Sequence, residues 1–215
     1  MKVTDKIIIT NEDNMALMAR YPDNYFELAI VDPPYGINAS KEKFTPKNET
    51  WNGKKKVGYK TKDWDLSIPK ELYFSELFRI SKNQIIWGGN YFGLIGGYIF
   101  WDKKETMPTY TQGELAYCSM INKIDKFEFL WSGYKKQEQE TRIHPTQKPV
   151  ALYKWLLDKY AKQGDKILDT HLGSGSIAIA CHDYGFDLTA CELDSEYYEK
   201  AVQRIKNHTS QQRLF

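Results

Sequence analysis

The chain has 215 residues, of which 41% are hydrophobic and 27% are charged, with a formal net charge of +2. These values fit one soluble globular domain with a substantial core. The sequence contains no apolar stretch long enough for a membrane span or a signal peptide, and its three cysteines show no CxxC spacing. We therefore expect free thiols, no metal site, no membrane association and a cytoplasmic location.

Two apolar runs near the start, 6–9 and 28–31, are typical of buried strands. The second is followed by the tetrapeptide DPPY, residues 32–35. Pro33 and Pro34 cannot donate backbone hydrogen bonds, so the strand must end there. Beyond the strand, the tetrapeptide offers a carboxylate, a rigid turn and an aromatic ring. This segment is either a simple turn or a pocket for a flat group that carries an amine.

A lysine-rich window follows at residues 41–62, with eight lysines, two glutamates and a net charge of +6. Phe44, Trp51 and Tyr59 are interleaved with the lysines. A lysine run alone favours a solvated loop. Because aromatic and glycine residues are mixed in, contact with nucleic-acid phosphates is a serious alternative.

The rest of the chain alternates between strand-like and helix-like patterns. Strands are predicted at 84–87, 98–101, 116–120, 166–168 and 188–191, and helices at 69–81, 149–162, 176–184 and 195–207. This alternation predicts an α/β fold with a mostly parallel sheet covered by helices on both faces. Ligands of such sheets bind at the carboxyl ends of the strands, so DPPY and the segment DTHLGSGS (169–176) should meet there.

The segment 166–180, KILDTHLGSGSIAIA, is typical of a strand, a tight loop and a helix. Gly173 and Gly175 allow the backbone to turn and a ligand to approach closely. Ser174 and Ser176 are expected to cap the following helix. A glycine turn in a generic α/β unit is the less favoured alternative for this segment.

Glu192 ends the next predicted strand, nineteen residues after Gly173, where an acid commonly binds ribose hydroxyls. The loop lacks the third glycine of a dinucleotide site and the lysine of a triphosphate site. Asp169, directly before the loop, would repel a pyrophosphate but attract an ammonium group. A ligand with a ribose, an adenine and an amino-acid ammonium is S-adenosylmethionine.

A methyl acceptor should then bind at DPPY. An exocyclic amine on a nucleobase is a poor nucleophile because its lone pair is delocalised into the ring. The Asp32 carboxylate and the Pro33 carbonyl can each accept one N–H of such an amine, and Tyr35 can stack on the base. A base inside a duplex cannot reach such a pocket, so it must be flipped out.

The motifs DPPY, HPTQKP (144–149) and DTHLGSGS, in this order, resemble the β-class of DNA amino-methyltransferases, which methylate adenine N6 or cytosine N4. The segments NQIIWGGNYF (83–92) and FWDK (100–103) are similar to small phage-type members. The resemblance implies one domain over residues 1–210 with a Rossmann-like, seven-stranded, mostly parallel sheet that binds S-adenosylmethionine. It also implies double-stranded DNA as substrate and is compatible with a homodimer.

The resemblance also assigns site residues. The amine pocket comprises Asp32, Pro33, Pro34 and Tyr35, and the cofactor residues are Asp32, Thr146, Lys148, Asp169, His171, Gly173, Ser174, Gly175 and Glu192. Thr146 and Lys148 would face the methionine carboxylate, beside a helix N-terminus that also favours an anion. His144 is given little weight as a general base, because the amine is already acidic after methyl transfer.

The chain departs from the family form DPFxGSGT at Thr170, His171 and Ser176. His171 could pack flat against the cofactor, although an ordinary loop histidine with satisfied hydrogen bonds is the simpler interpretation.

Contacts with DNA are expected from two regions. A small target-recognition insert is predicted at residues 103–143, where Arg142 or Gln137 would read bases. In the lysine-rich window, Lys54, Lys55 and Lys56 would bind phosphates, which positions the duplex without specifying its sequence.

The last five residues, QQRLF (211–215), resemble the peptide by which bacterial proteins bind the sliding clamp. Leu214 and Phe215 would insert into a hydrophobic pocket, with Gln211 bonded at its rim. The alternative is an amphipathic tail that folds back on the domain.

Adenine N6 is the favoured target, because the cytosine-N4 enzymes more commonly have serine at the position of Asp32. Cytosine N4 is the nearest alternative. Methyltransferases for RNA or for protein glutamine usually place the cofactor loop before the amine pocket. A catalytically silent DNA-binding or clamp-binding module is disfavoured, because the motif residues are intact.

Overall fold

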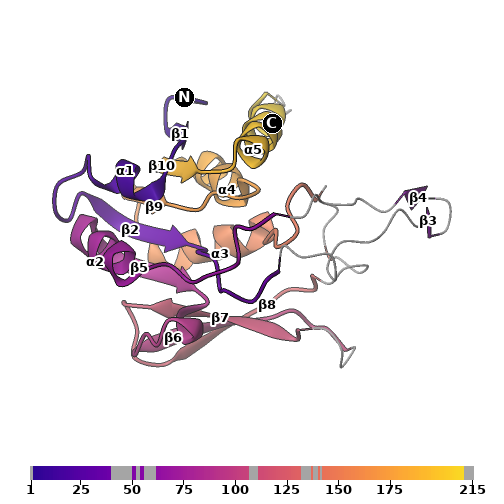
Figure 1. Cartoon of the computed structure of the whole chain (residues 1–215), viewed down its shortest axis with the longest axis horizontal. Helices are drawn as coiled ribbons and strands as arrows, with labels where there is room; N and C mark the ends of the chain where they lie inside the picture. The colour runs from indigo at the N-terminus through magenta and orange to yellow at the C-terminus, as the bar shows by residue number, and fades with distance from the viewer. Residues whose placement is uncertain are drawn as a thin grey trace.

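The computed structural model describes residues 2–39, 62–106, 111–131, 137, 140 and 142–210 and, as backbone only, residues 50–51 and 54–55. Its centre is an eight-stranded sheet with the order β1-β10-β9-β2-β5-β7-β6-β8 (Figure 1). The strands are β1 (Ile7–Asn11), β2 (Phe26–Val31), β5 (Ser81–Trp87), β6 (Gly97–Asp102), β7 (Gly113–Cys118), β8 (Ile124–Glu128), β9 (Lys166–Asp169) and β10 (Asp187–Glu192). Only β7 is reversed, since it pairs antiparallel with both β5 and β6 while the other pairs in this sheet are parallel.

Helices cover both faces of the sheet, as its apolar strands require. The helices are α1 (Asn14–Met18), α2 (Glu71–Ile80), α3 (Val150–Tyr160), α4 (Ser176–Tyr184) and α5 (Ser195–Thr209), and a short 3₁₀ turn, η2, spans Gly89–Tyr91. Helices α3, α4 and α5 share one buried cluster with the sheet, and α1 and α2 share the other.

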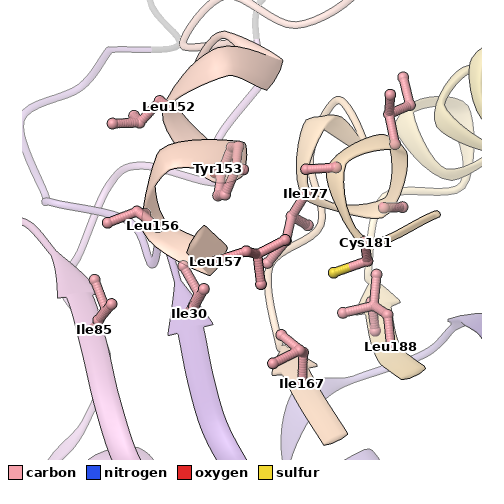
Figure 2. Close-up of a cluster of buried hydrophobic side chains, with 14 of the residues drawn as sticks. Ile30, Ile85, Leu152, Tyr153, Leu156, Leu157, Ile167, Ile177, Cys181 and Leu188 are labelled. Carbon is pink, nitrogen blue, oxygen red and sulfur yellow. The ribbon is translucent and has the colours of Figure 1, made fainter. Parts of the chain in front are cut away.

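The two clusters follow from the alternation of side chains along each strand. In β2, Leu28 and Ile30 belong to the cluster of α3 and α4, whereas Ala29 and Val31 belong to that of α1 and α2. Figure 2 shows the first cluster, in which α3 and α4 place their apolar side chains against those of β5, β2, β9 and β10. A core of this kind fixes the strand ends that carry the motifs.

The α/β class, the mostly parallel sheet and the two helical layers confirm the sequence prediction. Seven of the eight strands correspond to predicted runs, although β7 begins three residues before the predicted 116–120. The eighth strand, β8, was not predicted, because its sequence IDKFE is polar and lies at the sheet edge with mostly exposed residues. Helix α1 was also missed; it is only five residues long.

Two predicted features lie partly or wholly outside the described residues. In the lysine-rich window, β3 (Thr50–Trp51) pairs antiparallel with β4 (Lys54–Lys55), so this part of the expected loop is a small hairpin. Lys56 and the tail residues 211–215 are not described. Among the described residues, no helix is both long and apolar enough to cross a membrane.

Candidate active site

Three acidic residues lie at the carboxyl ends of three neighbouring strands. Asp32 directly follows β2, Asp169 ends β9 and Glu192 ends β10. Since β9 pairs with β2 on one side and with β10 on the other, all three lie along one edge of the sheet. The structure therefore brings DPPY and the glycine loop together, as the fold class predicts.

Both carboxylate oxygens of Asp32 accept hydrogen bonds. The Tyr35 hydroxyl donates to Oδ1 at 2.6 Å, and the Lys148 ammonium donates to Oδ2 at 2.5 Å. Lys148 Nζ also lies 3.1 Å from Glu114 Oε2 and 3.2 Å from the Tyr35 hydroxyl. The Lys148 side chain is only 3% exposed. The result is a partly buried polar network of four residues, in which the buried Lys148 bridges two carboxylates.

The charges of this network balance, because Lys103 pairs with the other oxygen of Glu114. Burial alone would raise the pKa of Glu114, but the Lys148 and Lys103 cations outweigh it and lower the pKa to about 2. Burial would likewise lower the pKa of Lys148, yet the two carboxylates raise it. For Asp32 burial is the largest effect and raises its pKa, although Lys148 opposes this. Lys148 and Glu114 are thus charged at neutral pH.

The Tyr35 ring is held in an aromatic stack. It lies parallel to Tyr91, with ring centroids 5.1 Å apart, and Phe92 packs edge-on at 6.3 Å. Gly88 lies so close that a Cβ there would come within 2.4 Å of the Tyr35 ring. Tyr91 is 48% exposed, so the two rings form an aromatic wall beside Asp32. Of the two prolines, Pro33 is buried and Pro34 is half-buried.

The two glycines of the glycine loop have different surroundings, one open and one tightly packed. A Cβ on Gly173 would meet no atom closer than 3.8 Å, whereas one on Gly175 would lie 2.8 Å from Ile205 of α5. Both have positive φ, +54° and +74°. The expected close approach of a ligand therefore fits Gly173, but Gly175 is required for the packing of α4 against α5.

The expected serine caps are wrong. Helix α4 has Gly175 as its N-cap and no side-chain cap. Ser176 instead donates to the Lys148 carbonyl oxygen at 2.7 Å, and the two hydroxyls of Ser174 and Ser176 lie 3.2 Å apart. Ser176 thus ties the glycine loop to the HPTQKP segment rather than to its own helix.

Glu192 holds the glycine loop from the side. Its carboxylate accepts the Gly173 N–H at 2.8 Å and the Asp194 N–H at 2.9 Å. Asp194 in turn caps α5 by accepting the Tyr197 N–H at 3.0 Å. Glu192 therefore connects the glycine loop to the start of α5.

Asp169 is 2% exposed and accepts the His171 N–H at 2.9 Å. Burial raises its pKa to about 8. No lysine or arginine among the described residues forms an ion pair with it. A buried carboxyl without a counter-cation is suited to receive an ammonium group.

Both ring nitrogens of His171 have hydrogen-bond partners. Its Nε2 lies 3.0 Å from the Asn14 amide nitrogen and its Nδ1 lies 3.0 Å from the Thr170 hydroxyl. The ring meets Tyr73 edge-on at 5.3 Å. Burial lowers its pKa to about 4, so it is neutral at physiological pH. The simpler interpretation, a loop histidine with both ring nitrogens satisfied, agrees with this geometry.

The HPTQKP segment docks beside the glycine loop, with His144 packed between Trp64 and Tyr197 at ring distances of 5.3 and 4.3 Å. Burial lowers the pKa of His144 to about 3, and its Nδ1 lies 3.1 Å from the Thr146 hydroxyl. Thr146 itself is exposed.

At the following helix N-terminus, Glu140 accepts the Val150 N–H at the start of α3, at 2.9 Å. A side chain of the protein thus already bonds one N–H group there. That this N-terminus also favours a ligand anion stays a prediction.

The predicted DNA-contacting residues are only partly described. Lys54 and Lys55 lie in β4, where the backbone alone is described. The Arg142 guanidinium lies 5.4 Å from the centre of the Trp131 ring, and Gln137 is exposed. Within the predicted insert 103–143, β7 and β8 belong to the central sheet, so recognition by this region is limited to the segments that connect or follow these strands.

Sequence reasoning missed Glu114, Lys103, Tyr91 and Asp65. Glu114 is an acidic residue in the otherwise apolar strand GELAYC, which is a detectable signal for a buried charge. Asp65, which is 1% exposed, lies in a polar segment without such a signal.

A glycine loop, an acid at the end of the next strand and DPPY on the same sheet edge form the arrangement that the resemblance to S-adenosylmethionine-dependent methyltransferases predicts. The profile of the N6/N4 methyltransferases, described as DNA methylase, matches residues 1–203. The chain therefore belongs to the N6/N4 DNA methyltransferase family, whose cofactor is S-adenosylmethionine.

Relatives and solved structures agree with this membership. The type II methyltransferase M.BglII of Bacillus subtilis is 22% identical over 257 residues, covering 96% of this chain and 71% of that protein. The crystal structure of the M1.HpyAVI–SAM complex aligns with a TM-score of 0.56 and 18% identity, covering 92% of this chain and 98% of the other. The PvuII DNA methyltransferase, which is cytosine-N4-specific, aligns with a TM-score of 0.58 and 10% identity over 93% and 90%. At these identities the structural likeness shows the fold alone.

Proposed function

We propose that the protein transfers a methyl group from S-adenosylmethionine to N6 of an adenine at a specific sequence in double-stranded DNA. The observation that carries this proposal is the state of Asp32, whose two oxygens each accept a bond from a donor, Tyr35 or Lys148. A carboxylate that already binds two donors can accept an N–H of an amine, and it lies on the same sheet edge as the cofactor loop.

An ionised carboxylate has more acceptor sites than these two donors occupy, so the amine can bind beside them. Glu114 lies 3.1 Å from the Lys148 ammonium and keeps this cation paired if the amine displaces it from Asp32. An N–H bonded to Asp32 and another bonded to the Pro33 carbonyl favour a tetrahedral nitrogen with its lone pair directed away from the ring. S-adenosylmethionine supplies the methyl group. The aromatic wall of Tyr35 and Tyr91 is suited to pack against the base.

The residues around the cofactor site suit its three polar parts. We assign the ammonium to Asp169, the ribose hydroxyls to Glu192 and the methionine carboxylate to Thr146, which is exposed beside the glycine loop. Lys148 faces Asp32 and Glu114 in this structure, so its predicted contact with the methionine carboxylate requires it to leave them.

No strong base is required in this scheme. The methylated nitrogen is cationic and loses its proton readily, even to water. His144, whose pKa burial lowers to about 3, is therefore not needed as a general base.

The target base must leave the duplex to reach Asp32. We assign phosphate contacts to Lys54, Lys55 and Lys56 of the lysine-rich window. Gln137 is exposed whereas Arg142 packs on Trp131, so Gln137 is the better placed of the two to read a base edge.

The proposal predicts a single methylated motif. The protein is expressed in a bacterium that lacks DNA methyltransferases, and the genome is sequenced with single-molecule reads that detect modified bases. We expect N6-methyladenine at one short motif and no mark with the Asp32→Ala variant. N4-methylcytosine would contradict the choice of base but keep the enzyme class, and the absence of any mark would contradict DNA methylation itself.

Cytosine N4 is the second candidate, since its amine has the same chemistry and the fold is shared with a cytosine-N4-specific enzyme. Asp32 is the residue that favours adenine, because serine is commoner at this position in the cytosine-N4 enzymes.

We also propose the bacterial sliding clamp as a partner of residues 211–215. Helix α5 ends at Thr209, so these residues directly follow the last element of the domain. Purified clamp should bind the full chain with at least tenfold higher affinity than a variant that lacks residues 211–215. Equal affinities, measured by surface plasmon resonance, would contradict this partner.

A further inference from the structure

Residues 62–65, here called the strap, contact the DPPY segment, the HPTQKP segment and the start of α5. Lys62 Nζ lies 2.5 Å from Asp194 Oδ2, 3.3 Å from Glu196 Oε2 and 4.2 Å from the centre of the Tyr197 ring. Trp64 packs on His144 of the HPTQKP segment. Asp65 is buried behind DPPY. Three of these four consecutive residues therefore join the cofactor side of the site to the amine side.

Asp65 holds the backbone that follows DPPY. Its carboxylate accepts the N–H groups of Tyr35 at 2.7 Å, Gly36 at 2.9 Å and Ala39 at 2.7 Å. Its backbone carbonyl accepts the Asn38 N–H at 3.1 Å. Four of the five amides in residues 35–39 are thus bonded to one residue. Gly36 has a left-handed φ of +71°, so this glycine and Asp65 together shape the backbone from which the Tyr35 side chain reaches Asp32.

The other end of the strap is bonded to the cofactor loop through two carboxylates. Gly173 donates to Glu192, Glu192 accepts the Asp194 N–H, and Asp194 pairs with Lys62. The Lys62 side chain is 16% exposed, so solvent screens this pair less than a surface pair. A continuous series of hydrogen bonds, ion pairs and one short backbone segment therefore joins Gly173 to Tyr35.

We propose that the strap couples the cofactor pocket to the amine pocket, with Asp65 as a positioning residue for Asp32–Tyr35 and Lys62 as the link to the cofactor loop. The inference deepens the proposed function and rests on its assignment of the two pockets. When the glycine loop is ordered by cofactor, Glu192 and Asp194 are ordered with it, and Lys62 transmits this order to Asp65. The amine pocket is then fixed before the base arrives.

Hydrogen exchange measured by mass spectrometry tests this coupling without any DNA, using S-adenosylhomocysteine as the probe. In the wild type we expect the probe to slow exchange in residues 169–175 directly and in residues 35–39 remotely, each by about fivefold or more. In Lys62→Met, at saturating probe, protection of 169–175 should persist and that of 35–39 should be lost. Lys200→Met is the matched control, because Lys200 pairs with Glu196 at 2.8 Å but lies outside the strap.

The Asp65→Asn variant tests the positioning role. An amide can accept fewer of the three N–H bonds and turns a donor toward one of them, so we expect kcat to fall by about 10- to 100-fold. The KM for S-adenosylmethionine should stay within about threefold, and exchange of residues 35–39 should accelerate. Asp63→Asn, an exposed neighbour, should leave kcat, KM and exchange unchanged.

The outcomes separate this inference from the proposed function. Two outcomes would overturn the coupling through the strap while leaving the cofactor site intact. In the first, the probe protects residues 169–175 of the wild type but not residues 35–39. In the second, Lys62→Met and Lys200→Met lose the protection of residues 35–39 to the same extent. Absence of protection in both loops would overturn the cofactor site and the strap together. A fall in kcat for Asp65→Asn that is fully explained by a lower fraction of folded protein would reduce Asp65 to a structural role and also overturn its assignment.

Discussion

Replacement of Asp32 by alanine is expected to lower the rate of methyl transfer by at least about 100- to 1,000-fold, which is the loss that follows removal of one preorganised polar group from an active site. In the proposed function Asp32 is the acceptor for the target amine, and the alanine variant also leaves the Tyr35 hydroxyl and the Lys148 ammonium without this partner. The affinity for S-adenosylmethionine should stay within a few-fold, because Asp169 and Glu192 are untouched.

The measurement is transfer of a tritiated methyl group to genomic DNA from a methylation-deficient bacterium, together with cofactor affinity by calorimetry. Asp158→Ala, which removes an exposed aspartate from the outer surface of α3, is the matched control and should retain full activity. Asp32→Asn keeps one acceptor oxygen and should be intermediate. Full activity in Asp32→Ala would refute the assignment of the amine pocket.

The sequence predicted the parts of this site that depend on local chemistry. Strand β2 ends before Asp32 because the two prolines that follow cannot donate backbone hydrogen bonds to a neighbouring strand. Strand β9 ends at Asp169 because the glycine loop follows it in the sequence. Because the fold class places the carboxyl ends of parallel strands at one edge, the meeting of DPPY with the glycine loop could also be deduced.

The partners of these residues could not be deduced, because they come from distant elements. Glu114 reaches Lys148 only because β7 is inserted antiparallel beside β5, and strand order is not encoded in local periodicity. Asp65 reaches the amides of residues 35–39 across a sequence separation of 26 to 30 residues. Gly175 was predicted to let a ligand approach closely. The structure shows another reason for a glycine at this position, since a Cβ would lie 2.8 Å from Ile205 of α5, thirty residues away in the sequence.

Replacement of Lys148 by methionine is expected to produce the largest loss of stability among the site variants, about 3–5 kcal/mol at pH 8, which is typical when one partner of a buried ion pair is removed. Methionine preserves the length and most of the volume of the side chain. It leaves Asp32 without a cation and beside Glu114, which retains only Lys103. An exposed control, Lys82→Met, breaks a surface pair with Glu27 and should change stability by less than about 1 kcal/mol.

The loss in Lys148→Met should depend on pH in a direction that identifies its cause. Burial already raises the pKa of Asp32, and removal of the Lys148 cation raises it further. Between its ordinary pKa and this raised value, Asp32 binds more protons in the folded variant than in the unfolded chain, so the stability of the variant falls as pH rises through this interval. The free energy of unfolding that the variant lacks relative to wild type, measured by urea unfolding, should therefore be larger at pH 8 than at pH 5.5.

Addition of Asp32→Asn to the Lys148→Met variant should recover most of the lost stability at pH 8 and flatten its pH dependence. A deficit that is the same at both pH values and is not relieved by Asp32→Asn would mean that Lys148 stabilises the protein through packing rather than as the counter-cation of the amine pocket.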